Sequence, residues 1–396
     1  MRDKVVITGL GAISALGQGK DVLIQGVRAG ESCQAPITNF DTSEFRCKKG
    51  CLIKENNLPQ GSGKDKALQL LLYAFDEAVR DAKFSGCENG KTLLLIGSIY
   101  GGIESWEKVR IALLRNEDFD RCALLEFPLW ALTEKLKTRL GRDVTSATIS
   151  TACASSDSAL GIALNAIRRK KAEVAIVGGV ELVSRFIFAG FNSLNSLTLT
   201  ECKPFDKNRD GLVLGEGAGV LVLESASHAE KRRTRIYAEL AGFGSCFDAY
   251  DLAAPEPKGH NRSISILNAL QDSNTAVEEV DFIKTHGTGT LSNDRVECIA
   301  LKKVFKDEMY SKPISSIKAV IGHTCGACGS LEGIISISCI QDNCIPPIAN
   351  FQEPDPAFQF EYVYGMSRSH PVNTVVQLAA GFGGSNTCLI FKRYQA

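Results

Sequence analysis

The sequence predicts an α/β protein made of two packed halves. Its 396 residues exceed the roughly 100 to 200 expected of a single domain, and 44% of them are hydrophobic, which is enough for a large core. Short β-branched runs alternate with stretches in which apolar residues recur at helical spacing. The polar, proline-containing stretch 248–262 separates two such sets. We therefore expect an N-terminal half at residues 1–243 and a C-terminal half at residues 244–396.

Each half has its own expected strands. The first set lies at residues 5–7, 92–96, 174–177 and 220–222, with a helix over residues 66–82. The second set lies at residues 282–285, 314–317, 374–378 and 388–391. Strands that alternate with helices in this way favour buried sheets covered by helices.

Composition excludes several classes of function. Lys plus Arg and Asp plus Glu both total 45, so the chain has no net charge with which to hold nucleic acid or an anionic membrane. No stretch approaches the roughly 20 apolar residues of a membrane span. The opening, residues 5–16, lacks the core and cleavage site of a signal peptide and predicts a first buried strand. We expect a soluble, cytoplasmic protein with no nucleic-acid or membrane partner.

Cofactor motifs are incomplete. Gly9 and Gly11 begin a dinucleotide fingerprint, but Ser14 occupies its third glycine position, and no Walker loop is present. The 14 cysteines have no repeating spacing, which is typical of a reducing compartment. Cys325 and Cys328 have metal-type spacing, yet no second pair completes a tetrahedral site. We expect no bound metal and no permanently bound cofactor.

A cysteine at the start of a helix is the first candidate for chemistry. A strand at residues 146–151 stops at Cys153, and apolar residues then recur at helical spacing from Ala159 to Ile167. The unpaired N–H groups and the positive end of a helix favour a thiolate over a thiol. Taken alone, a cysteine in this position is more often a packed core thiol, so its partners decide the interpretation.

Two of the five histidines, His286 and His323, follow strands in glycine-rich turns. A core histidine gains nothing from flanking glycines, whereas a histidine presented to a reacting group does, because glycine permits tight turns and close approach. A third glycine turn, at residues 380–386, also follows an apolar strand. Its N–H groups could form an oxyanion hole, although an ordinary hairpin explains it equally well.

Taken together, these segments resemble the β-ketoacyl synthase family of the thiolase superfamily, close to its discrete elongating condensing enzymes. The resemblance covers nearly the whole chain. It includes VVITGLGAISALG at residues 5–17, TACASS at 151–156, KPFDKNRDGLVLGEGAG at 203–219, THGTGT at 285–290, KAVIGHTCGACG at 318–329 and GFGGSN at 381–386. It implies a thiolase fold, in which two similar α/β halves form a layered α-β-α-β-α sandwich.

The resemblance also implies roles for individual residues. Cys153 would be the acyl acceptor, and His286 and His323 would hydrogen-bond the malonyl thioester carbonyl as decarboxylation makes it an enolate. Two donors fixed in a dry pocket stabilise that charge. The further implied residues are Lys318 and Glu332 as a supporting charge pair, Phe382 as oxyanion donor and gating aromatic, Thr288 and Thr290 as contacts of the phosphopantetheine arm, and Tyr100 and Phe191 as the floor of a short acyl pocket.

Departures from the family pattern point to a specialised substrate or carrier. Tyr100 is bulkier than the residue that long-chain synthases tend to have at the pocket floor. Residues 378–380 read Leu-Ala-Ala, where the family commonly has Asn-Ser-Phe before the gate. Ala253 replaces a frequent pantetheine-contacting hydroxyl, and Asn195 replaces a frequently basic residue on the carrier face. Lys64 and Lys66 are left as candidate carrier contacts, unless they are only a solvated helix start.

The sequence thus predicts a β-ketoacyl-acyl-carrier-protein synthase, an acyltransferase that works with acyl carrier protein as a homodimer. The alternative is the ketosynthase subunit of a specialised type II polyketide or polyene pathway, paired with a non-catalytic, chain-length-factor-like homologue. A non-catalytic subunit is disfavoured because Cys153, His286 and His323 are all present. A thiolase is disfavoured because the glycine turn at residues 381–384 has no second cysteine.

Overall fold

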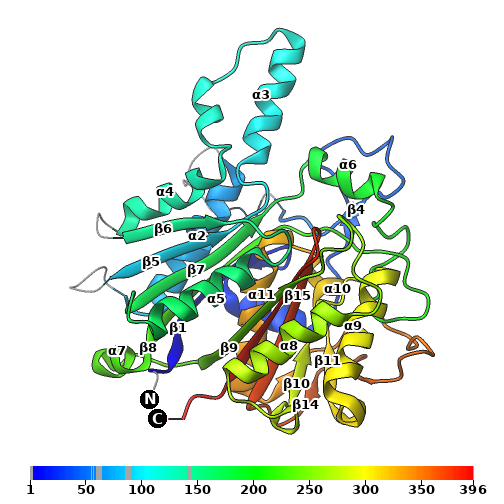
Figure 1. Cartoon of the computed structure of the whole chain (residues 1–396). Coiled ribbons are helices and arrows are strands. Elements are labelled where there is room, and N and C mark those ends of the chain that lie inside the picture. Colours follow the sequence, from blue (N-terminus) through cyan, green and yellow to red (C-terminus); the bar gives the residue numbers. More distant parts are fainter. Residues whose placement is uncertain are drawn as a thin grey trace.

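The computed structural model describes residues 3–54, 56, 58, 65–84, 91–140 and 144–395. Within this part of the chain, one 12-stranded sheet runs through both halves (Figure 1). Its strands follow the order β13-β11-β10-β15-β16-β9-β1-β8-β7-β5-β6, with the short β2 (Gly17–Gln18) paired to β1.

The N-terminal half contributes β6 (Val144–Ile149), β5 (Thr92–Gly97), β7 (Val174–Glu181), β8 (Gly217–Ser225) and β1 (Val5–Ser14), side by side in this order. The first three strands are parallel, and β8 is antiparallel to both of its neighbours. Its helices are α1 (Lys20–Ala29), α2 (Lys66–Asp81), α3 (Ile103–Arg115), α4 (Leu129–Leu140), α5 (Ser155–Arg168), α6 (Arg185–Ser193) and α7 (Ala226–Arg232).

The C-terminal half repeats this arrangement with β11 (Pro313–Ser315), β10 (Phe282–Lys284), β15 (Thr374–Gly381), β16 (Ser385–Lys392) and β9 (Ala238–Phe247). Again the first three strands are parallel and the fourth is antiparallel to its neighbours. The edge strand β13 (Glu361–Tyr362) extends the sheet beyond β11. Its helices include α8 (His260–Asp272), α9 (Leu291–Phe305), α10 (Lys318–Ile321) and α11 (Cys328–Asp342). The two halves therefore share one topology.

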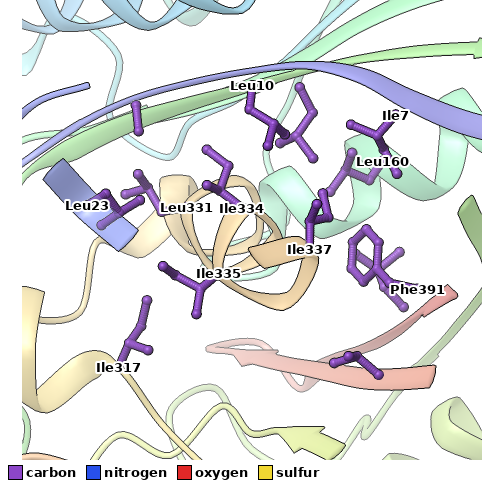
Figure 2. Close-up of a cluster of buried hydrophobic side chains, with 14 of the residues drawn as sticks. Ile7, Leu10, Leu23, Leu160, Ile317, Leu331, Ile334, Ile335, Ile337 and Phe391 are labelled. Carbon is purple, nitrogen blue, oxygen red and sulfur yellow. The ribbon is translucent and has the colours of Figure 1, made fainter. Parts of the chain in front are cut away.

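Helices α5 and α11 form the layer between the two halves of the sheet. In Figure 2, α11 lies between β1 and the strands of the C-terminal half, with Leu331, Ile334 and Ile337 among the buried side chains. Every residue of α11 from Cys328 to Ile340 is buried, as expected of a helix covered on all sides. Helices α2 and α4 pack on the N-terminal strands, and α8 packs on β9 and β16 with α9 beside it.

Successive residues of a strand point into different hydrophobic clusters, one on each face of the sheet. Helices therefore cover both faces. In β5, Leu95 joins the central cluster, whereas Leu94 and Ile96 join the cluster that contains α2. In β15, Val375 faces the central cluster and Val376 the cluster that contains α8. The layers are therefore α-β-α-β-α, as the resemblance implied.

The expected strands and the helix at residues 66–82 are confirmed, with longer bounds for most strands. The predicted boundary between residues 243 and 244 falls inside β9. Because β9 occupies in its half the sheet position that β1 occupies in the other, we propose that the C-terminal half begins just before β9.

Candidate active site

A tight elbow between β6 and α5 presents Cys153. The preceding residue, Ala152, has a left-handed backbone with φ of 51°, a conformation that costs a non-glycine residue free energy. The Ser155 hydroxyl secures the elbow, because it donates to the Ala152 carbonyl at 2.5 Å and accepts the Thr151 N–H at 3.0 Å. Cys153 therefore lies just before the first turn of α5 and is 5% exposed.

One cavity of about 420 Å³ joins most of the predicted site residues. The described residues that line it include Cys153, His286, His323, Thr288, Thr290, Phe191 and Phe382. The two histidine rings meet edge to face, with centroids 5.3 Å apart. The hydroxyl oxygens of Thr288 and Thr290 lie 2.9 Å apart. Residues from both halves of the chain thus line one shared cavity.

His323 is held in a defined orientation. The backbone N–H of Cys325 donates to its Nδ1 at 3.1 Å, and Cys328 Sγ lies 3.1 Å from the same nitrogen. Burial alone would lower the pKa of His323, but the sulfur atoms of Cys328 and Cys153 raise it to about 10. In the neutral form of the ring, the hydrogen bond that Nδ1 accepts places the ring hydrogen on Nε2. The ring also hydrogen-bonds the Cys153 thiol.

His286 is held through its backbone. Its N–H and that of Gly287 donate to the two carboxylate oxygens of Glu297 at 2.7 and 2.8 Å. Burial, and next the Lys318 ammonium, hold the pKa of His286 well below its usual range, so the ring is neutral. Among the described residues, none hydrogen-bonds its Nδ1.

A buried charge cluster lies close enough to His286 for its two lysines to lower the pKa of that ring. Lys318 Nζ is 2.5 Å from Glu332 Oε1, and Lys284 Nζ is 2.5 Å from Glu332 Oε2. All three side chains are at most 2% exposed. Two cations thus share one carboxylate, a pairing by which charges persist in a protein interior.

Several neighbours favour the thiolate of Cys153. A hydrogen bond from the Cys325 thiol, together with the His323 ring and the Lys318 charge, holds the pKa of Cys153 well below its usual range despite burial. Cys325 itself is shifted in the opposite direction, because its thiol hydrogen-bonds Cys153. These contacts favour Cys153 over Cys325 as the thiolate of the pair.

The glycine turn between β15 and β16 touches the elbow. A Cβ added at Gly381 would lie 2.9 Å from both the Ala152 Cβ and the Cys153 N, so only glycine fits there without a shift. The next residue, Phe382, is 38% exposed and stacks on Phe191 with ring centroids 5.5 Å apart. The turn is thus more than an ordinary hairpin, since it closes the space beside the thiol.

Tyr100 is not among the described residues that line this cavity. It packs with Phe191 and Cys325 in one apolar cluster, and its ring contacts Phe186 at a centroid distance of 6.5 Å. Its backbone N–H donates to the buried Glu181 at 3.1 Å. Whether Tyr100 ends an acyl pocket stays a prediction.

The sequence reasoning missed several residues that support the site. Lys284 directly precedes the THGTGT segment, where a charged residue at the end of a buried strand could have signalled it. Asp294 and Glu297 on α9 accept N–H groups of residues 286–289, and their spacing of three on a helix after a glycine turn was a readable signal. Cys325 gave no such signal.

The predicted carrier face needs correction. Lys66 is largely buried and pairs with Glu216 at 2.8 Å, so it is not a free surface cation. Lys64 lies outside the described residues. At Asn195, which lines the cavity, the exposed Arg46 guanidinium donates to the side-chain oxygen at 2.6 Å. A positive charge is therefore supplied beside this position from another segment of the chain.

In the described ranges, no helix is long and apolar enough to cross a membrane. The same ranges hold no group of three or more His, Cys, Asp or Glu side chains arranged to bind a metal ion.

The fold and the site define a class: two thiolase-like halves with a cysteine and a pair of histidines around one cavity at their junction. Family models identify the family. Residues 2–229 match the β-ketoacyl synthase N-terminal domain, and residues 237–352 match its C-terminal domain. The chain belongs to the β-ketoacyl synthase family.

Similar proteins agree over the full length. The chain is 34% identical to "3-oxoacyl-[acyl-carrier-protein] synthase 2" of Synechocystis sp., covering 100% of this chain and 99% of the relative. It is also 34% identical to the protein of the same name in Coxiella burnetii, with 98% of each covered. The ishigamide ketosynthase/chain length factor structure matches with a TM-score of 0.94 and 32% identity, covering 100% of both chains.

Proposed function

We propose that this chain catalyses the decarboxylative condensation of an acyl group bound to Cys153 with a malonyl unit carried by acyl carrier protein. The observation that supports it best is the convergence of a thiol of lowered pKa and two histidines on one buried cavity. Acyl carrier protein also appears in the names of both curated relatives.

In the first step, the Cys153 thiolate attacks the carbonyl of an acyl thioester on the carrier. The carbonyl oxygen becomes an oxyanion, for which the backbone N–H groups of Cys153 and Phe382 are the proposed donors. Collapse of the tetrahedral intermediate breaks the bond to the carrier sulfur. The acyl group remains on Cys153, and the carrier leaves as a thiol after it takes up a proton.

In the second step, malonyl thioester replaces the free carrier. His286 and His323 donate hydrogen bonds to its thioester carbonyl while the carbon-carbon bond to the carboxylate breaks and carbon dioxide leaves. The electron pair of that bond forms an enolate, whose carbon attacks the thioester on Cys153. Expulsion of the Cys153 thiolate yields the β-ketoacyl product on the carrier. Preorganised donors in a dry site favour this charge development.

The remaining residues of the proposal orient these groups. Lys318 and Glu332 support the histidines through their buried charge pair, and Thr288 and Thr290 contact the phosphopantetheine arm in the cavity. Arg46, exposed beside Asn195, is the proposed contact for an acidic carrier surface. The phosphopantetheine arm arrives with its carrier as part of the substrate, and the proposal needs no permanently bound cofactor.

Two carrier proteins test this activity directly. The purified chain is mixed with acyl-carrier and malonyl-carrier protein, and the product is expected to be a β-ketoacyl carrier two carbons longer than the donor acyl group. We also expect no thiolysis of acetoacetyl-coenzyme A, since the glycine turn at residues 381–384 supplies no second cysteine. Robust thiolysis without condensation would contradict the proposal.

We propose that Tyr100 limits the length of the acyl chain. Its ring lies with Phe191 in one cluster, and burial raises the pKa of its hydroxyl, which favours the neutral phenol. Replacing Tyr100→Ala should extend the accepted chain by two or more carbons, to be measured as acylation rates over a series of acyl carriers. Tyr100→Phe keeps the ring and should keep the preference. An unchanged preference in Tyr100→Ala would remove Tyr100 from the pocket.

Dimer formation follows from an exposed apolar surface on the projecting segment of α3 to α4 (Figure 1). Its exposed side chains are Ile111, Leu113, Leu114, Leu124, Leu125, Phe127 and Trp130. So much exposed apolar surface is typical of a protein interface. In the described part of the chain, β6 is the edge strand at one end of the sheet, where another chain can approach.

A second candidate function is a ketosynthase subunit that works with a non-catalytic homologue. The similarity to the ishigamide ketosynthase/chain length factor structure favours it. Sedimentation and activity of the chain purified alone separate the two. An active homodimer supports the first candidate, whereas an inactive chain that gains activity on addition of a homologous subunit supports the second.

A further inference from the structure

Lys284 is a buried cation that the proposed mechanism does not use. It is the last residue of β10, and its side chain is 0% exposed. Its Nζ lies 2.5 Å from Glu332 Oε2 and donates to the Thr285 carbonyl at 2.8 Å. His286 follows two residues later on the same turn. Lys284 therefore links the turn that carries one histidine to the carboxylate that holds Lys318.

The cluster carries more positive than negative charge. Glu332 is shared between Lys284 and Lys318, and these three groups sum to one positive charge. The nearby buried Asp157 accepts a hydrogen bond from Gln377 Nε2 at 3.1 Å. Burial and the charge of Glu332 raise the pKa of Asp157 to about 7, so it offsets this charge only in part at neutral pH.

A surplus cation in a dry interior costs free energy unless something compensates for it. An enolate that forms next to His286 and His323 is a compensating charge, and it exists only while the reaction proceeds. A single Lys–Glu pair would be neutral and would provide no such field. The second lysine thus supplies a positive charge that packing alone does not require.

We propose that Lys284 is a positioning residue for decarboxylation: it holds Glu332 from the side opposite Lys318 and keeps a net positive charge behind His286. This inference rests on the proposed function. It predicts an effect on the step that forms the enolate and little effect on acyl transfer to Cys153, which lies on the elbow of the other half.

Four purified full-length proteins test this inference: the wild type, Lys284→Met, Lys284→Arg and the control Lys312→Met. Lys312 is also a mostly buried, ion-paired lysine, but it precedes β11 at the end of the strand away from Lys318. For each protein, carbon dioxide release from malonyl-carrier protein gives kcat and KM, intact mass gives the rate of Cys153 acylation, and a thermal melt reports folding.

We expect Lys284→Met to lower kcat for decarboxylation roughly tenfold, less than the loss of a direct donor, because Lys284 acts through its neighbours. The KM and the acylation rate should stay within about twofold of wild type, because neither depends on enolate charge. Lys284→Arg should restore kcat to within about threefold, since it keeps the charge. Lys312→Met should leave all three quantities unchanged.

An unchanged kcat in Lys284→Met would overturn the inference. So would parallel losses in decarboxylation and acylation together with a lowered melting temperature, because these would show a structural role. If the wild type itself neither decarboxylates nor condenses, the proposed function fails instead. The wild-type assay therefore separates the two failures.

Discussion

The two halves of the molecule have the same strand order but place different chemistry at the same point. In the N-terminal half, β6 leads through a short elbow into α5, and the elbow carries Cys153. In the C-terminal half, β11 leads into α11 through the longer stretch 316–327, which carries Lys318 and His323. Both helices begin at the site. In the proposed mechanism, the acyl acceptor thus lies in one half and the groups that stabilise charge lie in the other.

The length of each connection explains this division. A nucleophile needs one sulfur that faces the cavity and the N–H groups of a helix start, which a tight turn provides. Stabilising an enolate needs donors whose own partners are fixed, and the longer connection supplies these. His323 is held by the Cys325 N–H, and Lys318 is held by Glu332 on α11.

The largest expected effect comes from substitutions that each remove the chemistry of one half. Cys153→Ala should lower condensation by at least about a thousandfold, because no acyl enzyme can form, while malonyl decarboxylation persists. His323→Ala should lower decarboxylation about a hundredfold or more, because it removes a donor to the enolate, while acylation of Cys153 continues. Carbon dioxide release and intact mass measure the two half-reactions. Equal loss of both half-reactions in both variants would contradict the division.

The contact between the halves can be disturbed at Gly381. In Gly381→Ala, the new methyl would meet Ala152 and the Cys153 N–H at 2.9 Å. We expect a loss of about 1 to 3 kcal/mol in the free energy of unfolding, because the well-packed elbow must shift. Acylation of Cys153 should slow by up to about a hundredfold, since the thiol moves from its productive position.

Gly190→Ala is the matched control, because a methyl there would meet no atom within 4 Å. Chemical denaturation and acylation rates measure both variants. If Gly381→Ala acylates as fast as Gly190→Ala, the turn does not position the elbow.

A smaller effect concerns ionisation rather than geometry. Because the neighbours of Cys153 lower its pKa, its alkylation by iodoacetamide should stay fast as the pH falls well below the ordinary thiol value of about 8.5. The buried Cys202, whose pKa burial raises to about 12, should remain unmodified in the folded protein. Peptide mass mapping over a pH series compares the two. A rate for Cys153 that falls off around pH 8.5 would show an ordinary thiol.

Much of the fold could be predicted because strands and glycine turns leave local signals. Periodicity located the strands, and the ordered motifs implied the thiolase-like layers. The predicted half boundary falls inside β9 because the polar stretch 248–262, which was taken as the guide, begins only where β9 ends. Nothing local indicates that β9 begins a second copy of the topology, which only strand pairing reveals.

Some residues of the site could be predicted from the sequence and others could not. Cys153, His286 and His323 stand out by residue type and setting, and the structure places them around one cavity. The roles of Lys284 and Cys325 depend on contacts with residues 48 and 172 positions away, Glu332 and Cys153. Lys66 was misjudged because its partner, Glu216, is also remote in sequence. Such pairings are set by packing, which a local pattern does not encode.

Stepwise mass spectrometry of the intact protein directly tests whether Cys153 accepts the acyl group and then passes it to the malonyl unit. The wild type is first given acyl-carrier proteins of increasing chain length and then malonyl-carrier protein. The account predicts a mass gain of one acyl group, located on Cys153, which disappears on addition of malonyl-carrier protein as a product two carbons longer forms. A stable acyl group on a different residue, or product formation in Cys153→Ala, would contradict it.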